Sequence, residues 1–275
     1  MLGSVALPWS VIPRRFTPRP ISPARGLPFW QEKTGEIVVA LSLFDVNWRE
    51  LFDLVTDGGP PPRHVCLRIM EGVEIRGMYA VALDVGDWPT GTNLTLENYG
   101  RIQGAGGEGG RGGDTSSNAD DSDGYPGGNG GDAFYTRHDV TLTNEGTVGG
   151  GGGGGGGSSV GNGANGSFSG GGGGGGGAGS NAGAGGSGGK GTASSDDGYP
   201  GDDGALTSGG DGGREGDTDT SVIYGGDGGG PGESGQKGDD DFASGGAGGS
   251  PGNAVDGDSH VTYETIGDIR GNQVN

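Results

Sequence analysis

The chain has 275 residues, only 28% of them hydrophobic, and a formal net charge of −20. So little apolar material cannot fill the cores of two ordinary domains, and so acidic a surface repels nucleic acid phosphates and anionic membranes. No apolar run approaches the ~20 residues that a membrane helix needs. We therefore expect no nucleic acid partner and no membrane insertion.

Residues 1–34 are rich in proline and arginine, a composition typical of an extended arm without regular pairing. Such an arm is expected to dock on another protein. The following residues, 36–44, predict a strand, and 46–55 predict a helix with one apolar face before DGGPPP ends it. We expect this face to pack on the strands; the alternative is a partner-binding face.

The one cysteine, Cys66, lies in the apolar stretch RHVCLRIM and has no second cysteine to pair with. This setting favours a small buried strand residue over a reactive thiol.

An internal repeat is the clearest strand signal. LTLENYGRIQG (94–104), VTLTNEGTVGG (140–150) and VTYETIGDIRG (261–271) align without a gap, and LRIMEGVEIRG (67–77) is a degenerate fourth copy. Alternating apolar residues predict a half-buried strand in each copy, Asn-x-Gly supplies a turn, and the ninth residue returns to the core. Each copy is therefore predicted to form one rung, and stacked rungs are predicted to share one core.

Glycine dominates the region 104–253. Ten of the 74 glycines precede this region and three follow it, which leaves 61 within it. They fall at every third residue or at two in three, and three residues per turn is the repeat of the polyproline-II-type helix. We predict packed polyglycine II helices that leave the rungs at Gly104 and Gly149 and return at Ala133 and Ala254.

The triplets also predict layers. In a helix with three residues per turn, GGx leaves one edge free for a side chain, whereas an unbroken glycine run can have neighbours on every side. The runs 149–157 and 170–177 are therefore predicted to be central. The predicted outer segments are 106–114, 183–191, 225–239 and 245–253. GYPG at 124–127 and again at 198–201 predicts hairpin ends.

Two alternative structures account less well for the glycine. A disordered linker is the main alternative, but the regular rungs on both sides argue against it. Collagen needs a longer uninterrupted G-x-y repeat and more than 14 prolines.

The sequence offers little chemistry of other kinds. A phosphate-binding loop fails at Lys190, which no Ser or Thr directly follows. The acidic clusters at 120–123 and 239–241 lack the spacing of known calcium loops, so we expect solvated charges and leave calcium open. His64, His138 and His260 form no set of nucleophile and base, which predicts no enzymatic activity and no cofactor.

At this point the residues resemble a known group. The blocks WPTGTNLTLENYGRIQGAGGEGGRGG, AFYTRHDVTLTNEGTVGGGGGGGGG and GNAVDGDSHVTYETIGDIRG resemble the glycine-rich host-specificity region of tailed-phage tail-tip and tail-fibre proteins. The triplets are also similar to those of distal adhesins on T-even-like long tail fibres, in which a polyglycine II sandwich carries variable receptor-binding loops. The resemblance covers roughly residues 45–275.

Together, the composition, the repeat and the triplets predict a mainly β protein with few helices, in three parts. These are a docking arm (1–34), a small α+β attachment domain with the first rungs (35–103), and a polyglycine II sandwich with interleaved rungs (104–275). The resemblance implies a phage adhesin in the distal tail of the virion, whose partners are a host surface receptor, either a glycan or an outer-membrane protein, and other tail proteins bound through the arm. A homotrimer is left open, and the alternative function is a purely structural fibre or spike subunit.

The segments between the glycine helices distinguish these functions, because an adhesin exposes aromatic side chains on loops. The predicted receptor-binding loops are 114–125, 158–169, 192–200, 217–224 and 239–244. Their aromatic residues, the candidate site, are Tyr125, Phe168, Tyr199, Tyr224 and Phe242. The alternative for each ring is a cap that shields the ends of the glycine helices.

Overall fold

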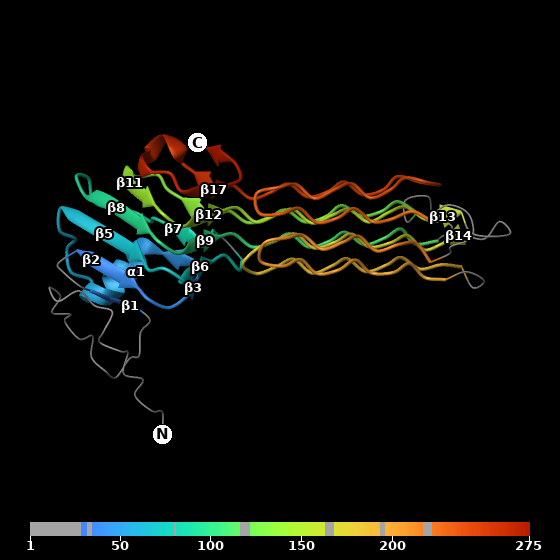
Figure 1. Cartoon of the computed structure of the whole chain (residues 1–275), viewed down its shortest axis with the longest axis horizontal. Helices are drawn as coiled ribbons and strands as arrows, with labels where there is room; N and C mark the ends of the chain where they lie inside the picture. Colours follow the sequence, from blue (N-terminus) through green and yellow to red (C-terminus); the bar gives the residue numbers. More distant parts are fainter. Residues whose placement is uncertain are drawn as a thin grey trace, which may run out of the picture.

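The computed structural model describes residues 29–31, 35–79, 81–115, 122–162, 168–192, 196–216 and 222–275. Two parts lie end to end: a base of short strands and an elongated body of glycine-rich segments (Figure 1). The structure is mainly β, as predicted, with a single α-helix in the described part of the chain.

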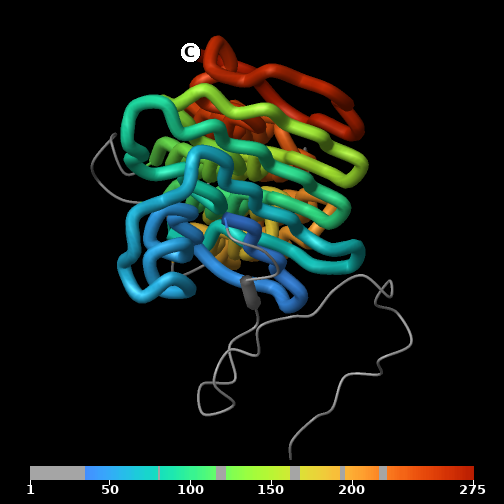
Figure 2. The backbone as a smooth tube through the Cα atoms, turned by 90° about the vertical axis from the view of Figure 1, so that its left-hand side faces the viewer, coloured from blue at the N-terminus to red at the C-terminus, as the bar shows by residue number. Residues whose placement is uncertain are grey.

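The base is a stack of coils, and successive coils add strands to three sheets (Figure 2). The first sheet has the order β1 (Phe29–Gln31), β2 (Glu36–Val39), β5 (His64–Ile69), β8 (Asn93–Asn98), β11 (Val140–Asn144) and β16 (Val261–Thr265). The second has the order β18 (Gln273–Val274), β15 (Val255–Asp256), β10 (Phe134–Tyr135), β7 (Leu83–Asp84) and β4 (Val46–Asn47). The third has the order β17 (Asp268–Arg270), β12 (Thr147–Gly149), β9 (Arg101–Gln103), β6 (Glu74–Arg76) and β3 (Leu43–Phe44). In these sheets the described pairs are parallel except β1 with β2.

The predicted rungs are confirmed. Val140 of β11 pairs with Leu94 on one side and Val261 on the other, as the gapless alignment requires. Inward residues such as Leu96 and Leu142 are fully buried in one continuous core. Burying a side chain of this size contributes about 1.5–3 kcal/mol, so the stacked rungs supply the main apolar stabilisation of the base.

The register predicted for the first strand of the fourth copy is wrong by two residues, whereas its second strand, β6, pairs as the alignment requires, with Ile75 opposite Ile102. Leu67 pairs with Leu96, whereas the alignment placed it opposite Leu94. The turn between β5 and β6 is two residues longer than the turn between β8 and β9, and it includes Gly72 with φ +75°. Because side chains alternate with period two, this shift keeps the same face inward, and Leu67 and Ile69 are both buried in the core.

A buried asparagine ladder holds the turns. Asn98 and Asn144 are both fully buried, and the Asn98 side-chain amide donates to Asn144 Oδ1 at 2.8 Å and to the Thr147 carbonyl at 3.1 Å. Asn144 in turn donates to the Ile266 carbonyl at 2.6 Å. The Asn-x-Gly turn predicted from the sequence is therefore also a bond between coils.

Three local predictions need correction. The single strand predicted for 36–44 is two strands, β2 and β3, in different sheets, because the chain turns a corner of the coil between them. The arm predicted to lack regular pairing ends in β1, which pairs with β2 and so covers an otherwise open edge. The short strands of the second sheet, such as β7, were not predicted, since two residues give no periodic signal.

The predicted helix is α1 (Trp48–Thr56), and its apolar face packs into the core as expected. Asn47 Oδ1 accepts a hydrogen bond from the Glu50 amide at 3.1 Å and caps the N-terminus, and Asp57 ends the helix in a left-handed conformation. α1 has nine residues, and nowhere in the described chain is there a helix suited to crossing a membrane.

Cys66 lies in β5 and is half-buried. Burial, with the nearby Glu97 and Glu36 carboxylates, raises the pKa of its thiol to about 12. The thiolate is therefore scarce near neutral pH, which supports the structural reading of this residue.

The two unbroken glycine runs are central, as predicted, since both are buried throughout. Residues 150–160 exchange backbone hydrogen bonds with six neighbouring segments, which are 104–113, 122–131, 170–179, 222–230, 232–240 and 244–253. Residues 170–179 bond in the same way to segments 183–191, 196–205 and 208–216 as well as to 104–113, 150–160 and 222–230. The two central segments therefore bond to each other, share 104–113 and 222–230 as neighbours, and are surrounded by the remaining glycine segments.

The three-residue period appears directly in these bonds. Gly151, Gly154 and Gly157 donate to one neighbour, at Gly131, Gly128 and Tyr125. In the described part of 104–253 only Gly232 has a positive φ, so the bulk of the glycine serves close approach rather than special backbone angles. A Cβ built on Gly153 would lie 2.0 Å from the Gly249 carbonyl oxygen.

Two predictions for the outer layer are wrong. Residues 225–239 form two segments rather than one, because the chain reverses at Gly232 (φ +73°) and the Glu233 amide donates to Gly230 O. The described GYPG residues lie in extended segments, not hairpin ends: the Gly124 and Gly127 amides donate to Ser244 O and Ala247 O, three residues apart. Proline suits this position because its fixed φ is close to that of the polyproline II helix.

Candidate functional site

The candidate site lies at the end of the body that is far from the base. A short hairpin, β13 (Gly161–Asn162) with β14 (Phe168–Ser169), marks this distal end (Figure 1). The central parts of four of the predicted loops (116–121, 163–167, 193–195 and 217–221) lie outside the described residues, and the loop 239–244 is described in full.

The feet of the five loops are joined by backbone hydrogen bonds. Val160 N donates to Ser122 O, Ser159 N to Asp239 O, and Thr192 N to Phe168 O. Gly170, directly after β14, donates to Asp196 O and accepts from Gly216 N. Segments far apart in the sequence therefore meet at one end of the molecule, around the loop 158–169.

A buried carboxylate ties two of these feet together. Glu215 is only 3% exposed; Ser169 Oγ donates to one of its oxygens at 2.9 Å and Ile223 N donates to the other at 3.3 Å. A side chain at Gly161 would collide with the same carboxylate. Glu215 therefore fixes the β13–β14 hairpin against the segment that enters at Ile223.

The candidate aromatic residues stand on this end and its flanks. Tyr125, Tyr199, Tyr224 and Phe242 are between 42% and 64% exposed, whereas Phe168 is half-buried. Phe168 and Phe242 meet edge to face with ring centroids 4.6 Å apart. The structure brings this pair together from two loops, but it does not gather all five rings in one cluster.

Two of the tyrosines carry an arginine on the ring. The Arg111 Cζ lies 4.7 Å from the Tyr125 centroid, and the Arg214 Cζ lies 4.5 Å from the Tyr199 centroid. Arg111 is also paired with Asp114, at 2.6 Å between Nη1 and Oδ2. These guanidinium contacts were not predicted, because residues 14 and 15 positions apart meet only through the packing of neighbouring glycine segments.

In the second acidic cluster, 239–241, carboxylates accept hydrogen bonds from other groups of the protein. Asp239 Oδ2 accepts from the Tyr224 amide at 2.9 Å, and Asp240 accepts from Lys237 Nζ and from the Gly245 amide, each at 2.6 Å. The Lys237 ammonium and the Gly245 amide hold the Asp240 pKa below its usual value. Among the described residues no group of three or more His, Cys, Asp or Glu could hold a metal; of the first cluster, Asp120 and Asp121 lie outside them.

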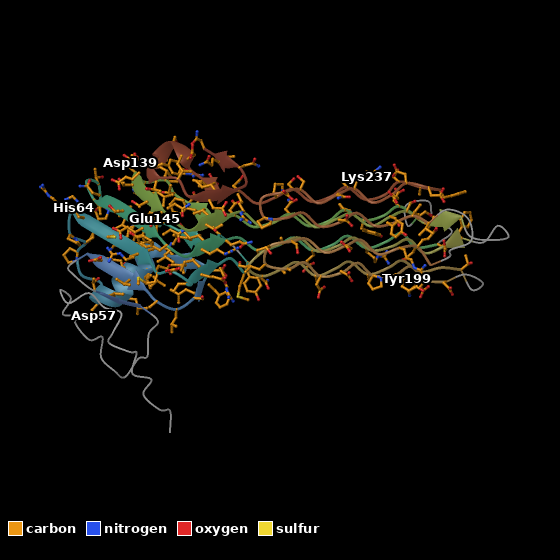
Figure 3. The ribbon with its side chains drawn as sticks, viewed as in Figure 1. Asp57, His64, Asp139, Glu145, Tyr199 and Lys237 are labelled. Atoms are coloured by element: carbon orange, nitrogen blue, oxygen red, sulfur yellow. The ribbon has the colours of Figure 1, made fainter. Side chains whose placement is uncertain are left out.

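The histidines lie in the base, far from the distal end, as the label of His64 illustrates (Figure 3). His138 Nε2 accepts from the Trp88 amide at 3.2 Å, and His260 Nδ1 lies 3.1 Å from Asp139. These contacts join neighbouring coils.

The chain matches a known family over nearly its whole length. The family model described as phage tail fibre adhesin Gp38 matches residues 34–274. The chain is also similar to a chain in the crystal structure of the gp37-gp38 adhesin tip complex of the bacteriophage S16 long tail fibre. The TM-score is 0.50, the identity is 26%, and the match covers 88% of this chain and 83% of that chain. No curated protein matches it.

These findings confirm the resemblance drawn from the sequence, together with the predicted function and its location in the distal tail of the virion. The chain belongs to the Gp38 family of phage tail fibre adhesins.

Proposed function

We propose that this adhesin meets its host receptor with the distal end of the glycine-rich body, through the aromatic side chains of the five loops. The observation that carries the proposal is the convergence of the loop feet on one end. The body is rigid because each central segment is bonded on all sides, so it holds that end away from the base. Loops on a rigid scaffold are the common arrangement for recognition.

The exposed tyrosines support this assignment. Each offers a flat apolar surface with a polar tip and has only two side-chain torsions to order on binding. The half-buried Phe168 fits the alternative role of a cap better, because its ring is partly removed from solvent and packs edge to face on Phe242.

At the opposite end, we propose that the base attaches the adhesin to another tail protein. Leu41, Phe44 and Leu54 are exposed on the first coil and α1, beside a shallow groove of about 230 Å³ that Phe44 and Leu54 help to line. The related structure is a complex of gp38 with gp37, which supports a tail-protein partner. Residues 1–28, the greater part of the predicted docking arm, lie outside the described residues, so the groove and the arm remain joint candidates for this contact.

The proposed role is binding rather than catalysis. The distal end offers aromatic rings, backbone groups and solvated carboxylates, and its buried acid, Glu215, is engaged by Ser169 and Ile223. The family is one of adhesins.

Replacing Tyr199 and Tyr224 together by alanine should reduce adsorption of the phage to host cells by roughly tenfold or more. Each stacked ring contributes about 0.5–1.5 kcal/mol beyond its buried area. Particle yield should be unchanged, because both side chains face solvent. Adsorption kinetics on whole cells measure the effect.

Tyr79→Ala is the matched control, since Tyr79 is 89% exposed but lies in the base, and it should adsorb normally. Normal adsorption after alanine replaces all five loop aromatics would show that receptor binding lies elsewhere.

A further inference from the structure

Tyr199, Arg214 and Tyr224 form a row across three neighbouring segments on the flank of the distal end. The Tyr199 amide donates to the Arg214 carbonyl at 2.9 Å. On the other side, Gly225 N donates to Gly213 O and Glu215 N to Ile223 O, so Arg214 and Tyr224 face each other in an antiparallel bridge. They form a non-hydrogen-bonded pair, the arrangement that brings opposite side chains closest. Figure 3 shows Tyr199 near the end of the body that carries β13 and β14.

The charge of Arg214 is unusual in this body. Residues 104–253 contain 5 Lys and Arg against 21 Asp and Glu. Arg111, Arg137 and Lys237 each have a carboxylate partner, at 2.6, 3.0 and 2.6 Å. Among the described residues no carboxylate lies within ion-pair distance of the Arg214 guanidinium, whose contact is the face of Tyr199. Lys190, whose backbone amide donates to Asp114, has within the described chain neither an ion pair nor an aromatic ring beneath its ammonium group.

We propose that the row of Tyr199, Arg214 and Tyr224 binds an acidic saccharide of the host surface, one that carries a carboxylate or a phosphate. The Arg214 Cζ lies over the Tyr199 ring at 4.5 Å from its centroid, and the N–H groups of the planar guanidinium can donate two parallel hydrogen bonds to the anion. The tyrosine rings on either side stack on the sugar. This inference rests on the proposed function, because it names the chemistry that the distal end recognises.

Charge complementarity favours this ligand over a neutral one. Residues 104–253 carry a net charge of −16, so an acidic group is repelled by most of this surface and is attracted at Arg214, where a cation without a carboxylate partner lies beside aromatic rings. The guanidinium thus determines which saccharide binds and where its acidic group lies along the row, while the rings supply much of the contact area. A neutral sugar would leave Arg214 without an anion and would be bound more weakly.

The test uses the full-length protein and the purified surface polysaccharide of the host, including its lipopolysaccharide. Arg214→Gln, which removes the charge and keeps much of the side chain, should weaken binding by at least about tenfold, as expected for loss of a charge-assisted bidentate contact. Arg214→Lys should retain part of the affinity, because it keeps the charge without the planar fork. Wild-type binding should weaken as salt rises, and the residual binding of Arg214→Gln should be far less salt-dependent.

The chain supplies its own matched control. Arg111 lies over Tyr125 as Arg214 lies over Tyr199, but Asp114 neutralises it, so Arg111→Gln should bind within about twofold of the wild type. Carboxyl reduction of the polysaccharide, or its dephosphorylation, should reproduce the loss seen with Arg214→Gln. The treatment that does so identifies the anion.

The inference is overturned if Arg214→Gln binds the polysaccharide as tightly as the wild type. It is also overturned if the wild-type protein binds host cells but not the polysaccharide, which would indicate a protein receptor. In both cases the proposed function would survive if replacing the loop aromatics still abolished adsorption. Unchanged thermal unfolding of Arg214→Gln establishes that a loss of binding is not a loss of folding.

Discussion

Replacing Gly153 by valine will prevent the glycine-rich body from folding. Gly153 donates to Glu233 O and accepts from Gly229 N, and a Cβ would lie 2.0 Å from Gly249 O. These neighbours are backbone atoms of adjacent segments, so no side chain can rotate away. The cost should exceed the ~1–3 kcal/mol of ordinary overpacking. Limited proteolysis and thermal unfolding of the purified protein measure the effect.

Glu108→Val is the matched control, because Glu108 occupies the free edge of an outer segment and its side chain is exposed. It should leave the midpoint of thermal unfolding within a few degrees of the wild type. Equal tolerance of valine at both positions would show that the two layers are wrongly assigned.

Asn144→Ala should destabilise the base by about 2–3 kcal/mol. The substitution leaves one of the two N–H groups of the buried Asn98 amide without its acceptor, which costs about 1–3 kcal/mol, and it removes the 2.6 Å hydrogen bond to the Ile266 carbonyl, which contributes about 0.5–1.5 kcal/mol. For a protein of this size that corresponds to a midpoint lower by roughly 4–12 °C. Thermal unfolding followed by circular dichroism is the measurement.

Its control is the neighbouring Thr143→Ala. Among the described residues, the Thr143 hydroxyl donates to the Glu264 carboxylate alone, at 3.0 Å and exposed to solvent, so its loss should cost less than about 0.5 kcal/mol. If the two variants unfold alike, the asparagine ladder does not stabilise the stack of coils.

Much of the fold could be predicted because the sequence repeats itself at two scales. The rung motif places Leu96 and Leu142 in one core, and the uninterrupted runs around Gly153 can only be central, because they have no side chain to expose. Both inferences depend on the pattern of residues within a single segment and need no knowledge of which segments lie beside it.

The errors arose where tertiary contacts decide the outcome. A two-residue shift at Leu67 leaves the apolar alternation intact, so the pattern could not reveal it. GYPG is a turn signal in most proteins, but here neighbouring glycine segments hold it extended.

In the candidate site, too, the residues that depend on tertiary contacts could not be predicted. Tyr199 and Tyr224 could be selected from the sequence as loop aromatics, whereas Arg214 could not, because its place beside Tyr199 depends on the order in which the segments surround the central pair. The convergence of the loop feet likewise follows from that packing and from the buried Glu215.

The central claim is that the distal end meets the host and the base meets the fibre. Photocrosslinking from two exposed phenylalanine positions tests it most directly, with a benzoylphenylalanine at Phe242 in the distal loop 239–244 or at Phe44 in the base. On intact particles adsorbed to host cells, Phe242 is expected to cross-link to a component of the host surface and Phe44 to another protein of the tail. Host cross-links from Phe44 but not from Phe242 would contradict the account.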